Sequence, residues 1–171
     1  MHDSILVTYA SRCGSTREVA ETVAREIARA NPEAEPGRPD RVELLPARAV
    51  TSLSGYRAVI VASAVRMGTW LPEAVAFVRA HAAELQKVKT AFVTVHMLNG
   101  DDSQASRRAR AAYLDAVHAT MTAPVEVFFA GRIELARMNA IDRLISTVMK
   151  AKDQDRRDWA SIQSWARSFA A

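Results

Sequence analysis

Short apolar segments alternate with longer amphipathic ones along almost the whole 171-residue chain, and this alternation limits the possible folds more than any other feature. The apolar segments are rich in Val, Ile and Phe, which is typical of strands that are covered on both faces. Strands that alternate with helices favour an α/β fold, in which right-handed crossovers join parallel strands into one sheet. The predicted strands span 4–10, 41–45, 57–63, 89–97 and 124–131.

The intervening segments predict three helices, over 15–30, 70–86 and about 102–121. No regular element is predicted for 46–56. The stretch 31–40 contains three prolines, and we expect it to be a polar connection inside one domain and not a domain boundary. A chain of this length suits a single domain with one core.

Two further helices are predicted near the end of the chain from apolar stripes with helical spacing. We expect both stripes to pack against the sheet, although the first also suits an interface with another chain. The first stripe consists of Met138, Ile141, Leu144, Ile145 and Val148, and the second of Trp159, Ile162, Trp165, Ala166 and Phe169.

The chain is basic, with a formal net charge of +4 and a sequence pI near 9.6. Much of the surplus lies in 107–110 and 150–159. Such clusters are usually solvated helix faces, and the alternative is attraction to an anionic membrane surface at about 1 kcal/mol for each well-placed cation. Nucleic acid is not expected as a partner, because the arginines do not interleave with aromatic residues.

The sequence shows no feature of an exported or membrane-spanning protein. No apolar run approaches the ~20 residues of a membrane span, and the opening MHDS does not resemble a signal peptide. One cysteine cannot form an internal disulfide. We therefore expect a cytoplasmic location, with contact to the inner face of the membrane as the alternative role of the basic clusters.

Four of the six glycines follow closely on predicted strands, namely Gly14, Gly68, Gly100 and Gly131. The carboxyl ends of parallel strands form one edge of a sheet, and ligands of open α/β sheets bind outside that edge. Glycine permits a positive φ or a close approach of the backbone there. Their joint placement therefore indicates a ligand site at this edge.

The segment SRCGST, residues 11–16, joins the first predicted strand to the first predicted helix. A helix N-terminus offers unpaired N–H groups and the positive end of its dipole to an anion. The lysine of G-x-x-x-x-G-K-[ST] is missing, as is G-x-G-x-x-G, so neither a triphosphate nor a dinucleotide is expected. A single phosphate monoester suits the loop, with Ser11, Ser15 and Thr16 as hydroxyl donors. The alternative is a helix cap formed by Ser11 or Ser15.

The pattern S-x-x-G-S-T resembles the FMN-phosphate loop of flavodoxins. The longer SRCGSTREVA is similar to the corresponding loop of the menaquinone-dependent protoporphyrinogen IX dehydrogenase family, a branch with the flavodoxin fold. The similarity continues in VIVASAVRMG (59–68), AFVTVHMLN (91–99) and RDWASIQSWARSF (157–169). It implies a doubly wound five-stranded parallel sheet of order 2-1-3-4-5, with helices on both faces, and FMN as the cofactor.

The resemblance also implies where FMN would bind. Its phosphate would contact the first loop, and its isoalloxazine ring would lie between the loops that follow the third and fourth strands. The residues implied for the phosphate are Ser11, Arg12, Cys13, Gly14, Ser15 and Thr16. Those implied for the ring are Ala64, Val65, Arg66, Met67, Gly68 and Trp70 on one loop, and Thr94, Val95, His96, Met97 and Asn99 on the other.

Several of these residues have alternative roles. Trp70 either stacks on the flavin or anchors a helix in the core, and Arg66 either faces the flavin edge or is a solvated cation. His96 is expected to cap the following loop in preference to contacting flavin or substrate. Asn99 and Asp101 are expected to be helix caps. Cys13 is expected to be a small, inert side chain.

The implied activity is that of an FMN-dependent oxidoreductase, which takes electrons from a reduced small molecule, such as a porphyrinogen, and passes them to a quinone. Because the flavin carries out the redox chemistry, no catalytic acid–base pair and no metal site are expected. The alternative is an electron carrier between proteins. Such flavodoxins are typically acidic, which suits basic partner surfaces, whereas this chain is basic. A flavin-free interaction domain is a third alternative.

Overall fold

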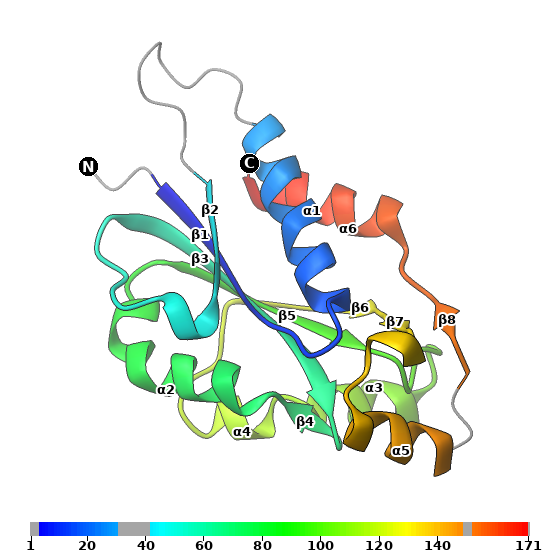
Figure 1. Cartoon of the computed structure of the whole chain (residues 1–171). Coiled ribbons are helices and arrows are strands. Elements are labelled where there is room, and N and C mark those ends of the chain that lie inside the picture. The colour runs from blue at the N-terminus through cyan, green and yellow to red at the C-terminus, as the bar shows by residue number, and fades with distance from the viewer. Residues whose placement is uncertain (1–3, 31–41, 149–151, 171) are drawn as a thin grey trace.

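In the computed structural model, which describes residues 4–30, 42–148 and 152–170, a parallel sheet lies between two layers of helices (Figure 1). The predicted strand order is confirmed, since the five parallel strands follow one another as second, first, third, fourth and fifth in chain order. Across the sheet they are β2 (Val42–Pro46), β1 (Ser4–Ala10), β3 (Tyr56–Arg66), β5 (Lys89–His96) and β6 (Val125–Ala130).

Helices α1 (Ser15–Ala30) and α6 (Trp159–Ala170) cover one face of the sheet, and α2 (Pro72–Leu85) and α4 (Asp115–His118) cover the other (Figure 1). Strand β1 supplies both cores, because Ile5 and Val7 pack under α1 while Leu6 lies on the α2 side. The apolar stripe of α6 packs against the α1-side core, as predicted. The connection 31–40 lies outside the described residues.

The predicted helix over 102–121 is wrong in one respect, because it is divided into α3 (Gln104–Ala112) and α4. The carbonyl of Tyr113 accepts a hydrogen bond from the Trp70 N–H at 3.3 Å. Trp70 belongs to β4 (Thr69–Trp70), a short antiparallel partner of β3, so the helix that was expected from residue 70 begins only at Pro72. A 3-10 turn, η1 (Ala47–Ala49), occupies part of the segment for which no element was predicted.

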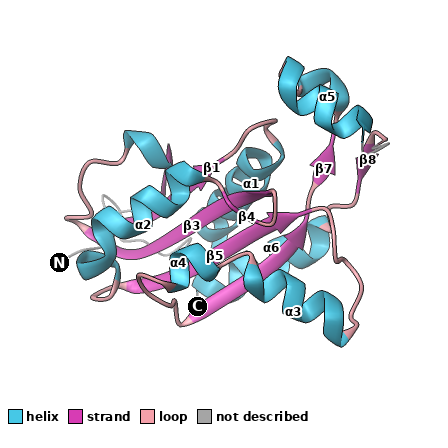
Figure 2. Ribbon diagram, turned by 90° about the horizontal axis from the view of Figure 1, so that it is seen from below, coloured by secondary structure: helices cyan, strands magenta, loops and turns pink. Residues whose placement is uncertain are grey.

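A small excursion follows β6 and leaves the main sheet (Figure 2). It contains β7 (Arg132–Ile133), the 3-10 turn η2 (Leu135–Arg137), α5 (Ala140–Val148) and β8 (Gln154–Asp155), with β7 and β8 paired antiparallel. The expectation that the stripe over 138–148 packs against the sheet is wrong for Ile141, Leu144 and Val148, which are exposed, whereas Met138 is half-buried. The chain turns away at Gly131, so no sheet surface lies beneath α5.

None of the helices among the described residues combines the length and the apolar character needed to cross a membrane.

One buried hydroxyl generates a stability prediction. The Oγ1 atom of Thr8, in the middle of β1, is buried and has no hydrogen-bond partner among the described residues. Thr8→Val keeps the shape and removes the unpaired hydroxyl, so the free energy of unfolding is expected to rise by about 1 kcal/mol. Denaturant unfolding measures the change.

Thr90 provides the matched control. It is equally buried, and its hydroxyl donates to the Leu85 carbonyl at 2.7 Å. Thr90→Val is therefore expected to lower the free energy of unfolding by about 1–3 kcal/mol. A destabilised Thr8→Val protein would contradict the interpretation of Thr8 as unpaired.

Candidate functional site

The loop 11–16 forms an open set of backbone donors at the start of α1. The Ser11 Oγ accepts from the Gly14 N–H at 3.1 Å, and the Gly14 carbonyl accepts from the Glu18 N–H at 2.9 Å. Gly14 has a φ of +87°, which a residue with a side chain rarely adopts. Among the described residues, nothing accepts from the N–H groups of residues 15–17, as is usual in the first turn of a helix. The loop thus presents three N–H donors beside a residue without a side chain.

The two hydroxyls that follow Gly14 point into the structure. Ser15 Oγ accepts from the Arg132 N–H at 2.9 Å, and Thr16 is buried. A Cβ on Gly131 would lie 2.9 Å from Val95 Cγ1 and 3.3 Å from Ser15 Oγ. Glycine at 131 therefore permits the first loop, the end of β5 and the end of β6 to pack together. The Ser11 Oγ accepts from the Gly14 N–H, which precedes α1, and the Ser15 Oγ accepts from Arg132, so among the described contacts neither serine caps the first turn of the helix.

The loop after β3 is a tight hairpin. Met67 and Gly68 both have positive φ, of 52° and 77°, and they form the two-residue turn between β3 and β4. A positive φ at methionine is strained, and such strain is concentrated at functional sites. The Met67 side chain is 88% exposed. An apolar side chain is thus held in solvent at the ligand edge of the sheet.

Trp70 and Thr94 belong to the core and not to the surface of the site. Trp70 is 1% exposed, its Nε1 donates to Thr94 Oγ1 at 2.9 Å, and its ring meets Phe92 edge-on. The interpretation of Trp70 as a stacking partner is therefore wrong for this structure, and the core-anchor alternative is the observed one. Val95 is buried as well, so only the backbone of residues 94 and 95 is available to a ligand.

The loop after β5 is stabilised by His96. Its Nδ1 lies 2.7 Å from the Leu98 carbonyl, which is the capping role expected for it. Burial lowers the pKa of His96, the bond to Leu98 opposes this, and Arg110 lowers it further, so the ring is neutral at pH 7. Asn99 is not a helix cap, since it has a φ of 60° and its amide donates to the Tyr113 hydroxyl at 2.6 Å.

The cap of α3 is Ser103, whose side chain accepts from the Ser106 N–H. Asp101 accepts from the Ser103 N–H and stabilises the turn before the helix, so its predicted capping role is also wrong. Leu98 is exposed in this loop and was missed by the sequence analysis. Leu98 follows another apolar residue, Met97, so the sequence did not distinguish it from the end of the strand.

Asp142 of α5 connects two of the three loops. Its carboxylate accepts from Arg66 Nη2 at 2.7 Å, and it lies 3.9 Å from Arg12 Nη1. Arg66 is therefore an ion-pair partner and not a free solvated cation. Burial raises the pKa of Cys13, Asp142 raises it further, and Arg12 opposes the rise. The thiol is thus protonated at neutral pH, which agrees with its expected inert role.

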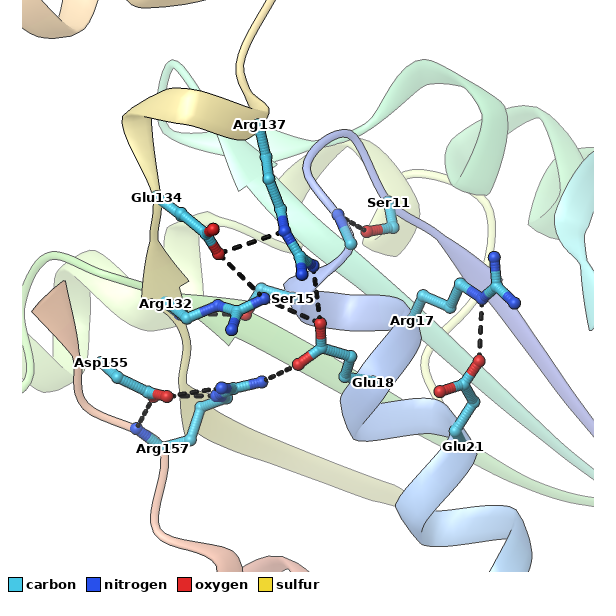
Figure 3. Close-up of polar contacts among 11 residues, drawn as sticks. Ser11, Ser15, Arg17, Glu18, Glu21, Arg132, Glu134, Arg137, Asp155 and Arg157 are labelled. Atoms are coloured by element: carbon cyan, nitrogen blue, oxygen red, sulfur yellow. Dashed lines mark hydrogen bonds and ion pairs between the residues drawn. The ribbon is translucent and has the colours of Figure 1, made fainter. Parts of the chain in front are cut away.

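A cluster of three arginines and three acids lies beside the first loop (Figure 3). Glu18 is its centre, because its carboxylate accepts from Arg132 at 2.7 Å, Arg137 at 2.9 Å and Arg157 at 2.5 Å. Glu134 pairs with Arg132 and Arg137, and Asp155 pairs with Arg157. We call these six residues the Glu18 cluster. It attaches the β7–β8 excursion to the first turn of α1.

The charges of this cluster change the pKa values of its carboxyl groups. Burial alone would raise the pKa of Glu18, but the hydrogen bond from Arg157 and the charges of Arg132 and Arg137 outweigh it, and the pKa is lowered. The Arg157 hydrogen bond holds the pKa of Asp155 at about 2. Arg157 belongs to the basic segment 150–159, so part of that segment is used inside the molecule and not for an anionic partner.

A separate cavity of about 410 Å³ lies on the β6 side of the loop after β5. It is lined by His96, Gly100, Arg110, Glu126, Val127, Phe128 and Ala130. None of these residues belongs to the loop 11–16 or to the turn at Met67.

Residues 6–158 match the flavodoxin domain. The chain belongs to the flavodoxin domain family. It is similar to a Leishmania major protein named protoporphyrinogen IX dehydrogenase (quinone), with 25% identity over an aligned length of 176 that covers 97% of this chain and 74% of that protein.

Solved structures share the flavodoxin fold. Oxidised flavodoxin 1 of Bacillus cereus is similar with a TM-score of 0.57 and 12% identity, over 97% of this chain and 96% of that chain. The rubredoxin oxygen:oxidoreductase of Desulfovibrio gigas is similar with a TM-score of 0.57 and 14% identity, over 98% of this chain but only 35% of that one. At these identities the similarity concerns the fold alone.

The Glu18 cluster generates a prediction with a pH signature. Glu18→Gln removes the acceptor that three arginines share, so the free energy of unfolding at pH 7 is expected to fall by about 1–3 kcal/mol. Because the folded-state pKa of Glu18 is lowered, its contribution is complete above its ordinary pKa and is lost as pH falls through the folded value. The difference between wild type and Glu18→Gln is therefore expected to disappear in acid, as measured by chemical denaturation across pH.

Glu21→Gln is the control. Glu21 lies one turn further along α1 and pairs only with the exposed Arg17 at 2.8 Å. Its loss is expected to change the free energy of unfolding by less than about 0.5 kcal/mol. Equal effects of the two substitutions would show that the cluster does not stabilise the fold.

Proposed function

We propose that this flavodoxin-domain protein is an FMN-dependent oxidoreductase, with the phosphate on loop 11–16 and the ring between the loops after β3 and β5. The observation that carries the proposal is the set of free N–H groups at residues 15–17 beside Gly14, with its left-handed backbone. A helix N-terminus of this kind is suited to a phosphate group. The resemblance of SRCGST to flavodoxin phosphate loops supports the same assignment.

The residues present fit a flavin. Exposed Met67 and Leu98 offer apolar contacts on the two loops proposed to flank the ring, together with the backbone of Ala64, Val65 and Gly68. Bound FMN would supply the redox chemistry, accepting electrons from one molecule and passing them to another. The protein's part is to bind and orient it. Neutral His96 donates from Nδ1 to the Leu98 carbonyl, which leaves its Nε2 as a hydrogen-bond acceptor.

We propose a porphyrinogen as the electron donor and a quinone as the acceptor. The name of the Leishmania major protein supports this pair of substrates, although its identity to this chain is only 25%. The exposed apolar residues of α5, Ile141, Leu144 and Val148, offer a surface for such apolar molecules. A peripheral contact with an anionic membrane, where quinones reside, belongs to the same proposal and draws on the basic surface of the chain.

A second candidate is an electron carrier that serves protein partners. The full-length similarity to small flavodoxins such as that of Bacillus cereus favours it. The net charge of +4 favours the enzyme, because flavodoxin carriers typically use acidic surfaces to bind basic reductases. The two candidates differ in whether a small molecule alone reduces the protein.

An anaerobic titration separates the two candidates. Protoporphyrinogen is added to FMN-loaded protein, and absorption of the oxidised flavin is followed before and after menaquinone is added. The enzyme is expected to lose the flavin absorption and recover it over many turnovers. A flavin that binds and stays oxidised would reject the porphyrinogen activity and favour the carrier.

The phosphate loop is tested by Gly14→Ala. A Cβ at φ +87° is strained and would lie 3.4 Å from Arg137 Nη1, so the loop must change shape and FMN affinity is expected to fall about tenfold or more. Gly55→Ala is the matched control, because Gly55 has a φ of +95° in a remote turn, and only its chain neighbours would lie within 4 Å of an added Cβ. Both variants are expected to lose about 1–2 kcal/mol of stability, and only the first to lose FMN. Equal affinities would reject the assignment of this loop.

A further inference from the structure

We propose that Arg137 supplies a positive charge to a phosphate monoester bound at the loop 11–16, by turning from Glu18 to that phosphate. The inference rests on the proposed function and assigns a phosphate-binding residue outside the loop. No lysine or arginine stands at residues 13–16, and the charge instead comes from η2 in the excursion after β6.

The position of Arg137 is the first argument. Its Nη1 lies 3.4 Å from the point that a Cβ on Gly14 would occupy. Among the described residues, and apart from the neighbours of Gly14 in the chain, only the Glu18 carboxylate also comes within 4 Å of that point. The guanidinium therefore lies against the residue that immediately precedes the free N–H groups of residues 15–17 (Figure 3). A phosphate bound by those N–H groups would be within reach of Arg137.

The freedom of Arg137 is the second argument. Its side chain is 48% exposed, against 20% for Arg132 and 4% for Arg157. If Arg137 leaves Glu18, Arg132 still donates to Oε1 and Arg157 to Oε2. Each carboxylate oxygen of Glu18 thus keeps a charged partner. Arg137 is the most exposed of the three arginines, and Glu134 keeps Arg132 as a partner when Arg137 departs.

The other nearby cations have acidic partners of their own. Arg66 donates to Asp142, Arg12 lies 3.9 Å from the same carboxylate, and Arg17 donates to Glu21 on the outer face of α1. The Glu18 carboxylate near Gly14 would repel a phosphate dianion, so retention of Arg132 and Arg157 on Glu18 also favours anion binding. Arg132 and Arg157 thereby neutralise Glu18, and Arg137 becomes available to the phosphate.

The test is a comparison of FMN with riboflavin, which lacks the phosphate. Dissociation constants are measured from flavin fluorescence for wild type, Arg137→Gln and Arg17→Gln. Arg137→Gln is expected to weaken FMN binding about tenfold, leave riboflavin binding within about twofold, and reduce the salt dependence of FMN binding. Arg17→Gln, which removes an exposed arginine from the same helix, is expected to change none of these. Arg137→Lys is expected to restore part of the loss.

Two results would overturn the assignment. If Arg137→Gln binds FMN as wild type does, the arginine does not contact the phosphate. If FMN and riboflavin weaken equally, Arg137 holds the excursion in place and does not bind phosphate. Circular dichroism and thermal unfolding show whether each variant folds, and Arg137→Lys replaces Arg137→Gln as the decisive variant if the latter unfolds.

Inorganic phosphate separates this inference from the proposed function. If wild type binds no FMN, the proposed function fails, and thermal stabilisation by inorganic phosphate is then compared between wild type and Arg137→Gln. A stabilisation that is lost in the variant supports Arg137 as an anion ligand without any flavin. No stabilisation of the wild type overturns both proposals.

Discussion

Parallel pairing of β1 with β2 on one side and β3 on the other is the constraint on which the site depends. The five residues Ile5–Tyr9 are paired on both edges, and the strand is covered on both faces, so the position of its carboxyl end is fixed from every side. Because β3 and β5 run in the same direction, their following loops emerge at the same edge. The sheet thereby holds the loop 11–16 beside the loops at Met67 and Leu98.

The sequence predicted what depends on local periodicity and on chain direction. Apolar segments such as 57–63 located the strands, and glycines such as Gly14 and Gly68, both with positive φ, located the edge of the sheet where loops turn. The break between α3 and α4 was not predicted, and the carbonyl of Tyr113 at this break accepts from the N–H of Trp70, a residue distant in the sequence. Trp70 itself was ambiguous, since a core anchor and an exposed stacking residue have the same sequence signal beside a strand end.

The Glu18 cluster was not predicted for a different reason. Its partners are separated from Glu18 by 114, 119 and 139 positions, and no local pattern connects them. A glutamate in the first turn of a helix reads as an ordinary favourable charge near the dipole. For the α5 stripe, the sequence predicted a contact that the structure lacks. The helical spacing is present, but the sheet does not extend beneath the helix. In both cases the excursion after β6 decided the outcome.

Gly131 contacts both the end of β5 and the start of α1 at this edge of the sheet. It packs between Val95, at the end of β5, and Ser15, at the start of α1, and its N–H donates to the His96 carbonyl at 2.8 Å. A residue with a side chain there would clash with both neighbours and push the first loop away from the loop after β5. The spacing between an anion site and a ring site on this edge therefore depends on the absence of a side chain at Gly131. Changes in the length or sequence of either loop can accumulate while that spacing stays the same.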